Sequence, residues 1–240
     1  MSTEPLESAE PLESAALPDA VLFDMDGLLV ETEHLWYRAE LAVIAEIGGE
    51  WTPQHQEELV GGPLERAVEL LVESSGGDHD HDAVMTLLLD SMVHLLRTEP
   101  VHWRPGATEL LTSLETAGVP RALVSASWRN VVDAVHDAVL HELGHELFDV
   151  TVAGDDLERT KLFPDPYLHA AAALGVDPRH CVVLEDSHTG STAGRASGAL
   201  VVAVPSLVPI DPAEGMHVVA SLTELTPELL GTWSYAWSPR

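Results

Sequence analysis

The sequence predicts an α/β protein in which a doubly wound parallel sheet carries a small all-helical insert after its first strand. Three observations predict this fold. Short apolar or β-branched runs recur along the chain, segments with helical periodicity separate them, and the interval from Leu35 to Arg97 has helical periodicity without a strand. Strands that are apolar throughout are typical of a parallel sheet covered by helices on both faces. Such a sheet binds its ligands beyond the carboxyl ends of its strands.

Polar residues end several of the predicted strands. The strands are expected, in order, at 20–23, 121–124, 150–153, 181–184 and 200–204. The polar residues that follow them are Asp24 with Asp26, Ser125, and Glu185 with Asp186. The predicted domains are a tail at 1–18, an α/β core at 19–34 and 99–240, and a helical cap at 35–98 that lies over the strand ends.

The predicted tail contains a repeated hexapeptide. Residues 4–9 and 10–15 both read Glu-Pro-Leu-Glu-Ser-Ala, which is too acidic and too poor in apolar surface to order itself. We therefore expect residues 1–18 to be flexible.

Composition bounds the class of protein. With 240 residues and 45% hydrophobic content, the chain can bury a globular core. It has no apolar run of about 18 residues and no basic or apolar leader, so we expect no membrane span and a cytoplasmic location. Cys181 is the only cysteine, which excludes an intrachain disulfide and predicts a buried, unreactive thiol.

The charge is strongly negative. A formal net charge of −29 repels nucleic acid and anionic membranes, so we expect neither as a partner. Adaptation to high salt is one hypothesis that explains it, because counterions screen repulsion between carboxylates. Ten of the eleven basic residues are arginine, which makes the single lysine, Lys161, a candidate for a specific role.

The polar strand ends offer the groups that phosphoryl transfer needs. This reaction requires a nucleophile, a cation on the non-bridging oxygens, an acid for the leaving group and fixed donors around the phosphate. Asp24 and Asp26 lie two residues apart, and Gly27 allows the backbone to turn behind them. Glu185 and Asp186 supply the hard oxygen ligands that suit Mg²⁺.

Four motifs in this order resemble the haloacid dehalogenase superfamily of phosphatases and phosphomutases, and the resemblance extends from about residue 20 to 205. The motifs are Asp24-Met25-Asp26-Gly27-Leu28-Leu29-Val30-Glu31-Thr32-Glu33, Leu123-Val124-Ser125-Ala126-Ser127, Lys161 with Phe163-Pro164-Asp165-Pro166-Tyr167, and Leu184-Glu185-Asp186-Ser187-His188-Thr189-Gly190. The helical insert resembles the small cap of β-phosphoglucomutase-like and phosphoglycolate phosphatase-like members. The resemblance implies a Rossmann-like core.

The resemblance also implies a catalytic and a metal site. Asp24 would attack phosphorus to form an aspartyl-phosphate, and Asp26 would protonate the leaving alkoxide and then activate water. Asp24, the main-chain carbonyl of Asp26, and Asp186 would hold Mg²⁺, with Glu185 in or near the layer of residues that surrounds these ligands.

Further positions would bind phosphate and substrate. The resemblance implies that Ser125 and the amide of Ala126 hold the phosphoryl oxygens, while Lys161 neutralises charge on the phosphate and among the carboxylates. Asn130 follows this loop closely and is a candidate substrate contact, as is its neighbour Arg129. Leu162 stands where the family usually has proline, which predicts a different local loop shape.

These roles predict a phosphoric monoester hydrolase that acts on a small phosphorylated metabolite, such as a sugar phosphate. A β-phosphoglucomutase-like mutase is the alternative, but Leu64 and Trp36 stand where that mutase has arginine and histidine. Asp26 argues against a dehalogenase, which does not need a second aspartate. A binding module without catalysis would normally lack an aspartate or the lysine.

A fifth motif points to a different chemistry. His141-Glu142-Leu143-Gly144-His145 matches the zinc-protease pattern His-Glu-x-x-His, which requires both imidazoles on one helix face. Gly144 weakens that helix, and we treat zinc proteolysis as a lesser alternative. The run Asp78-His79-Asp80-His81-Asp82 follows two glycines and is predicted to be a solvated loop of the cap.

Overall fold

The computed structural model describes residues 17–59 and 64–237. Most of the predicted tail, residues 1–16, therefore lies outside the described residues. The described chain forms one parallel sheet of six strands in the order β3-β2-β1-β4-β5-β6. The strands are β1 Ala20–Phe23, β2 Arg121–Val124, β3 Val150–Val152, β4 Cys181–Glu185, β5 Leu200–Ala203 and β6 Met216–Val218. The edge strand β6 was not predicted, because three half-exposed to exposed residues carry no apolar run.

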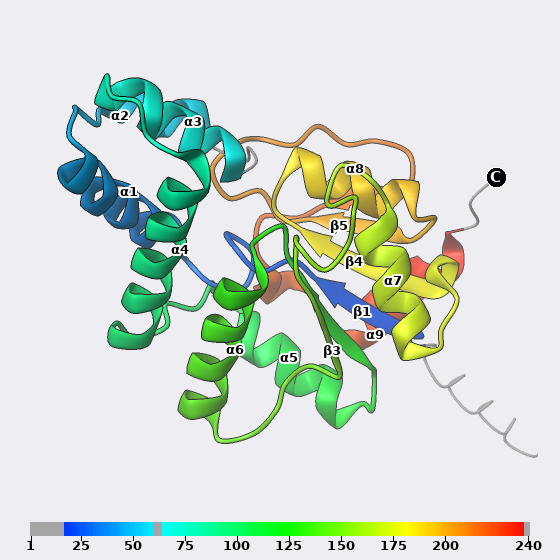
Figure 1. Cartoon of the computed structure of the whole chain (residues 1–240). Coiled ribbons are helices and arrows are strands. Elements are labelled where there is room, and N and C mark those ends of the chain that lie inside the picture. Colours follow the sequence, from blue (N-terminus) through cyan, green and yellow to red (C-terminus); the bar gives the residue numbers. More distant parts are fainter. Residues whose placement is uncertain (1–16, 60–63, 238–240) are drawn as a thin grey trace, which may run out of the picture.

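Helices cover both faces of the sheet (Figure 1). In β1, Val21 and Phe23 face one layer, and Ala20 and Leu22 face the other. The first layer consists of α5 Ala107–Thr116, α6 Arg129–Leu143 and α9 Pro227–Ala236, and the second of α7 Asp165–Leu174 and α8 His188–Ala196. Two short 3-10 helices, η1 Pro178–His180 and η2 Leu222–Glu224, complete the core. Because both faces are buried, the strands read as continuous apolar runs.

Four consecutive helices form the cap between β1 and β2. They are α1 Glu33–Ile47, α2 Pro53–Leu59, α3 Leu64–Ser75 and α4 His81–Thr98. Figure 1 shows them beside the sheet, beyond the carboxyl ends of its strands. The described residues between β1 and β2 contain no strand of the sheet. The predicted fold class, a doubly wound parallel α/β core with an all-helical cap after the first strand, is confirmed.

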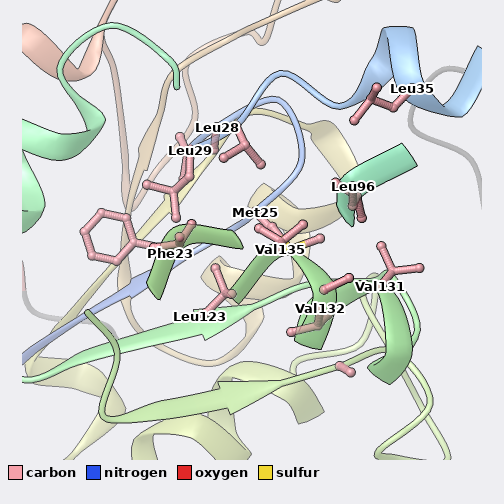
Figure 2. Packing of buried hydrophobic residues seen from close by; sticks show 14 of the residues in the cluster. Phe23, Met25, Leu28, Leu29, Leu35, Leu96, Leu123, Val131, Val132 and Val135 are labelled. Carbon is pink, nitrogen blue, oxygen red and sulfur yellow. The ribbon is translucent and has the colours of Figure 1, made fainter. Parts of the chain in front are cut away.

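An apolar contact joins the cap to the core. Helix α4 packs against both α1 and α6. Figure 2 shows Leu96 of α4 between Leu35 of α1 and Val131 of α6, and all three side chains are buried. None of the described helices is both long and apolar enough to span a bilayer.

The register of the sheet aligns the strand ends that carry polar residues. Phe23 pairs with Leu123 on one side and with Leu184 on the other. The residues that follow, Asp24, Val124 and Glu185, therefore begin the same edge of the sheet. The predicted site residues are brought together by this edge.

Candidate active site

Asp24 and Lys161 form the buried centre of the site. Lys161 comes from the loop after β3, and its Nζ contacts a carboxylate oxygen of Asp24 and Oε1 of Glu185, the latter at 2.7 Å. Burial alone would lower the pKa of Lys161, but the two carboxylates outweigh it and raise that pKa, so the ammonium stays charged. Burial, followed by the charge of Glu185, raises the pKa of Asp24. The single positive charge of Lys161 thus does not neutralise all the negative charges of the carboxylates in this centre.

Glu185 is fixed by donors on both of its oxygens. Besides Lys161, the Tyr167 hydroxyl donates to Oε1 at 2.5 Å, and the Ser187 hydroxyl donates to Oε2 at 2.9 Å. Burial and the charge of Glu185 raise the pKa of Tyr167, which keeps the phenol protonated as a donor. Tyr167 and Ser187 were recognised only as members of motifs. Their spacing along the chain gives no sign that both reach the same carboxylate.

Three carboxylates can hold a metal ion. Asp24, Glu185 and Asp186 each offer an oxygen, and these oxygens lie within 4.8 Å of one another. Burial and the charge of Glu185 raise the pKa of Asp186 to about 7, and Ser206 donates a hydrogen bond of 2.5 Å to it. Hard oxygens whose mutual repulsion is undercompensated fit a divalent cation such as Mg²⁺. Glu185, predicted to lie in or near the layer of residues around the ligands, offers an oxygen to the same group.

A glycine allows this cluster to close. Gly27 has a φ of +78°, which favours glycine. A Cβ at Gly27 would lie 2.1 Å from Oδ2 of Asp186. The turn after Asp26 therefore brings the first motif against the fourth.

Asp26 lies apart from this cluster and is held by hydroxyl groups. Thr32 donates to its Oδ1 at 2.5 Å, and Ser127 and Ser125 donate to its Oδ2 at 2.9 and 3.3 Å. The side chain of Asp26 is not part of the carboxylate group that can hold a cation, as expected if this residue contributes its main-chain carbonyl. Thr32 and Ser127 were missed as partners of Asp26, since both contacts depend on how the linker and the loop fold back.

The predicted phosphate loop lies beside Asp26. Ser125 is buried at the end of β2, and its hydroxyl accepts the amide of Ser127 at 2.9 Å. The loop that follows β3 lies against Ala126, because a Cβ at Gly154 would come within 2.1 Å of the Ala126 carbonyl oxygen. This packing fixes the backbone whose amides are predicted to hold phosphate.

The two candidate substrate contacts differ in their surroundings. The guanidinium of Arg129 is bound by protein oxygens. It binds Asp156 through two nitrogens and donates to the Thr151 hydroxyl at 2.9 Å. These contacts tie Arg129 to β3 and to the loop that follows it. Asn130 is exposed in the first turn of α6, and its contact with substrate stays a prediction.

The zinc-protease motif does not form a metal site. Helix α6 ends at Leu143, and Gly144 follows with a φ of +80°, so His141 and His145 do not share a helix face. Glu142 accepts a hydrogen bond from Trp103 at 3.1 Å, and His145 pairs with Glu115 at 3.3 Å. Within the described ranges 17–59 and 64–237, the group of side chains that can hold a metal ion is a different one, at the strand ends.

The remaining positions that the sequence analysis singled out lie in ordinary structural surroundings. Asp80, in the run 78–82, caps α4 by accepting the amide of Ala83 at 3.0 Å. Cys181 is buried, and burial raises the pKa of its thiol to about 12, which makes it unreactive at neutral pH. At Leu162, where the family usually has proline, the backbone adopts a φ of +88°.

The fold and the site define a capped α/β enzyme with an acidic centre at the strand ends. The chain belongs to the haloacid dehalogenase-like hydrolase family, whose model matches residues 21–204. The resemblance predicted from the four motifs is confirmed.

Individual relatives are similar to this chain over most of its length. Hexitol phosphatase B of Escherichia coli K12 is 33% identical over 221 residues, which cover 88% of this chain and 96% of that protein. The bifunctional riboflavin kinase/FMN phosphatase of Arabidopsis thaliana is 30% identical over 92% of this chain, which spans only 56% of its length. The crystal structure of CbbY from Rhodobacter sphaeroides in complex with phosphate has a TM-score of 0.77 at 27% identity and covers 87% of this chain and 96% of its own.

Proposed function

We propose that this protein is a Mg²⁺-dependent phosphatase that hydrolyses a small phosphomonoester, a sugar or sugar-alcohol phosphate, through an aspartyl-phosphate. The observation that carries the proposal is the convergence of Asp24, Lys161 and the carboxylates of Glu185 and Asp186 at one edge of the sheet. The names of relatives support the substrate class, since hexitol phosphatase B is 33% identical over 221 residues.

The residues divide the first half of the reaction between them. A carboxylate oxygen of Asp24 attacks phosphorus, and the bond from phosphorus to the leaving oxygen breaks. Asp26, held by hydroxyls beside the phosphate loop, gives its proton to that oxygen. Lys161 stabilises the charge that develops on the phosphoryl oxygens, and Ser125 and the Ala126 amide orient them.

The second half of the reaction regenerates the free carboxylate of Asp24. A water molecule attacks the aspartyl-phosphate while Asp26 accepts its proton, and inorganic phosphate leaves. Asp24, Glu185, Asp186 and the main-chain carbonyl of Asp26 are the groups that would hold Mg²⁺. When bound, the ion supplies the positive charge that one lysine does not provide for these carboxylates and the phosphate.

The test is phosphate release from a panel of sugar and sugar-alcohol phosphates, with Mg²⁺ and with EDTA. Release should require Mg²⁺, and the Asp24→Asn variant should lose it while keeping the wild-type melting temperature. Asp90→Asn, at an exposed position of α4, is the matched control and should keep full activity. Acid-quenched wild-type enzyme should carry hydroxylamine-labile phosphate that Asp24→Asn lacks. Retained turnover in Asp24→Asn would overturn the mechanism, and interconversion of glucose 1- and 6-phosphates without release would indicate a mutase.

A further inference from the structure

Each of the three carboxylates that can hold a cation has an oxygen engaged by a protein donor. Lys161 contacts Oδ1 of Asp24 and Oε1 of Glu185. The hydroxyl of Ser206 donates to Oδ2 of Asp186 at 2.5 Å. The three side chains therefore enter this group with part of their capacity to bind a cation already used.

Ser206 comes from the loop between β5 and β6, outside the four motifs of the sequence. The amide of Val204, directly after β5, donates to the last carbonyl of β4 at 2.7 Å, which places the start of the loop beside the end of β4. Nε2 of His188, in the first turn of α8, hydrogen-bonds to the carbonyl oxygen of Pro209 at 3.0 Å. Contacts on both sides of Ser206 along the chain thus hold its hydroxyl group against Asp186.

The oxygen of Asp186 that Ser206 binds is also enclosed by the turn of the first motif. A Cβ at Gly27 would lie 2.1 Å from Oδ2 of Asp186 and 3.0 Å from the hydroxyl oxygen of Ser206. Oδ2 therefore lies against both the backbone of Gly27 and the side chain of Ser206. A cation that bound both oxygens of Asp186 would have to displace the serine hydroxyl from Oδ2.

From this arrangement we infer that Ser206 restricts Asp186 to one cation-binding oxygen and thereby selects Mg²⁺ over Ca²⁺. The inference rests on the proposed function, which requires Mg²⁺, and it makes Ser206 a positioning residue that acts through Asp186. Ca²⁺ takes roughly six to eight oxygens and accepts carboxylates through one or both of theirs, whereas Mg²⁺ requires near-ideal octahedral geometry and keeps several waters. A carboxylate that offers one fixed oxygen suits the smaller ion, and a carboxylate that can turn suits the larger one.

The test is the affinity of the intact protein for each ion, measured without substrate. Isothermal titration calorimetry with MgCl₂ and with CaCl₂ gives two dissociation constants, and their ratio is the selectivity. Ser206→Ala should weaken Mg²⁺ binding by about tenfold, because Asp186 loses the hydrogen bond that orients it. The same variant should bind Ca²⁺ at least as tightly as the wild type, since Asp186 can then offer both oxygens. Ser206→Thr keeps the hydroxyl and should keep the wild-type ratio.

The next residue of the loop supplies the matched control. Leu207→Ala shortens a side chain that is 55% exposed, keeps the Ser206 hydroxyl, and should leave both dissociation constants unchanged. An unchanged ratio in Ser206→Ala, whether both affinities hold or both fall, would overturn the inference. An equal loss of selectivity in Ser206→Thr or in Leu207→Ala would also overturn it, because the loop and not the hydroxyl would then be the cause. A wild type that binds no Mg²⁺ and releases phosphate in EDTA would instead refute the Mg²⁺ dependence of the proposed function.

Discussion

Leu162 has the one positive φ among the non-glycine residues that the structure describes, at +88°. Left-handed backbone costs a residue with a side chain roughly 1–2 kcal/mol. The surroundings hold it there: Lys161 is bound by two buried carboxylates on one side, and the Phe163 amide donates to the Thr160 carbonyl at 3.1 Å on the other. Proline, with its φ fixed near −65°, cannot adopt this conformation. The left-handed backbone at residue 162 therefore explains why this chain has leucine there and not the proline that is usual in the family.

Replacing Leu162 by glycine should stabilise the protein. Its side chain is 56% exposed and contributes little packing, so the backbone decides the outcome. Glycine removes the strain but increases the entropy of the unfolded chain, and we expect Leu162→Gly to exceed Leu162→Ala by about 0.5–1 kcal/mol in the free energy of unfolding. Leu162→Pro should be less stable than either. Urea unfolding of the three variants measures this order, and a glycine variant no more stable than the alanine variant would contradict the strain.

The first turn of α8 and the end of β4 form one unit around Glu185. Ser187 caps the helix by accepting the amide of Gly190, and it also donates to Glu185. A Cβ at Gly190 would lie 1.7 Å from Oε1 of Glu185, the oxygen that binds Lys161 and Tyr167. Helix α8 can approach the strand end this closely only without a side chain at residue 190. The position of Lys161 therefore depends on a helix it does not belong to.

Gly190→Ala should inactivate the enzyme through this contact. Glu185 is buried and held by three side chains, so it cannot move aside freely, and displacing it breaks the contact that positions Lys161. We expect at least about a hundredfold loss in kcat and about 2 kcal/mol of destabilisation from overpacking. Gly77→Ala is the control, because its new methyl group meets only the imidazole of His79 at a loop of the cap. Phosphate release and urea unfolding of both variants provide the measurement; wild-type kcat in Gly190→Ala would show that Glu185 is not essential for positioning.

Helix α1 contains a buried acid that makes cap stability depend on pH. Glu40 is 3% exposed and accepts the Trp51 indole N–H at 3.0 Å. Burial raises its pKa from 4.5 to about 7. Folding therefore favours the protonated form, and the stability that protonation supplies is present below about pH 4.5 and is lost as pH rises to about 7.

Glu40→Gln should remove this pH dependence while keeping an acceptor for Trp51. Between pH 5 and 8, the free energy of unfolding of the wild type should fall relative to the variant by up to about 3 kcal/mol. Urea unfolding at both pH values, followed by tryptophan fluorescence, measures the difference. Glu46→Gln, at an exposed position of the same helix, should show the same pH dependence of the free energy of unfolding as the wild type. A constant gap between wild type and Glu40→Gln would mean that Glu40 does not titrate in this range.

The sequence allowed the elements to be predicted better than the contacts between them. Apolar runs gave the five main strands because both faces of the sheet are buried, whereas the edge strand β6 has no such signal. Asp24 and Asp186 were predicted from carboxylates at strand ends, and Lys161 from its being the single lysine and from its place in the third motif. The partners of Asp26 and Glu185, above all Thr32 and Tyr167, could not be predicted, because they depend on loops and helices that fold back to the strand ends. Arg129 was a candidate by proximity in sequence, but Asp156 binds it.

At the scale of the whole molecule, charge is the dominant feature. Acidic residues number 40 against 11 basic ones, for a net charge of −29. Surface ion pairs offset few of these charges, and each contributes at most about 1 kcal/mol. Repulsion among the remaining carboxylates opposes the compact state, because unfolding spreads them apart. The folded protein is therefore expected to depend on counterions.

Molar salt should raise the melting temperature. The screening length falls from about 10 Å at 0.1 M to about 3 Å at 1 M, so repulsion between neighbouring carboxylates is strongly reduced. If this relieves about 2 kcal/mol, a domain of this size gains roughly 5 °C. Calorimetry at pH 7.5 in increasing KCl measures the shift in melting temperature.

At pH 4.5, the isoelectric point of the sequence, the same salt series should give almost no shift, because the protein then has no net charge and its charged groups no longer repel one another overall. Sucrose at equal osmolality controls for stabilisation by excluded solutes. A melting temperature that stays constant with salt at pH 7.5, or rises equally at both pH values, would exclude carboxylate repulsion as the cause.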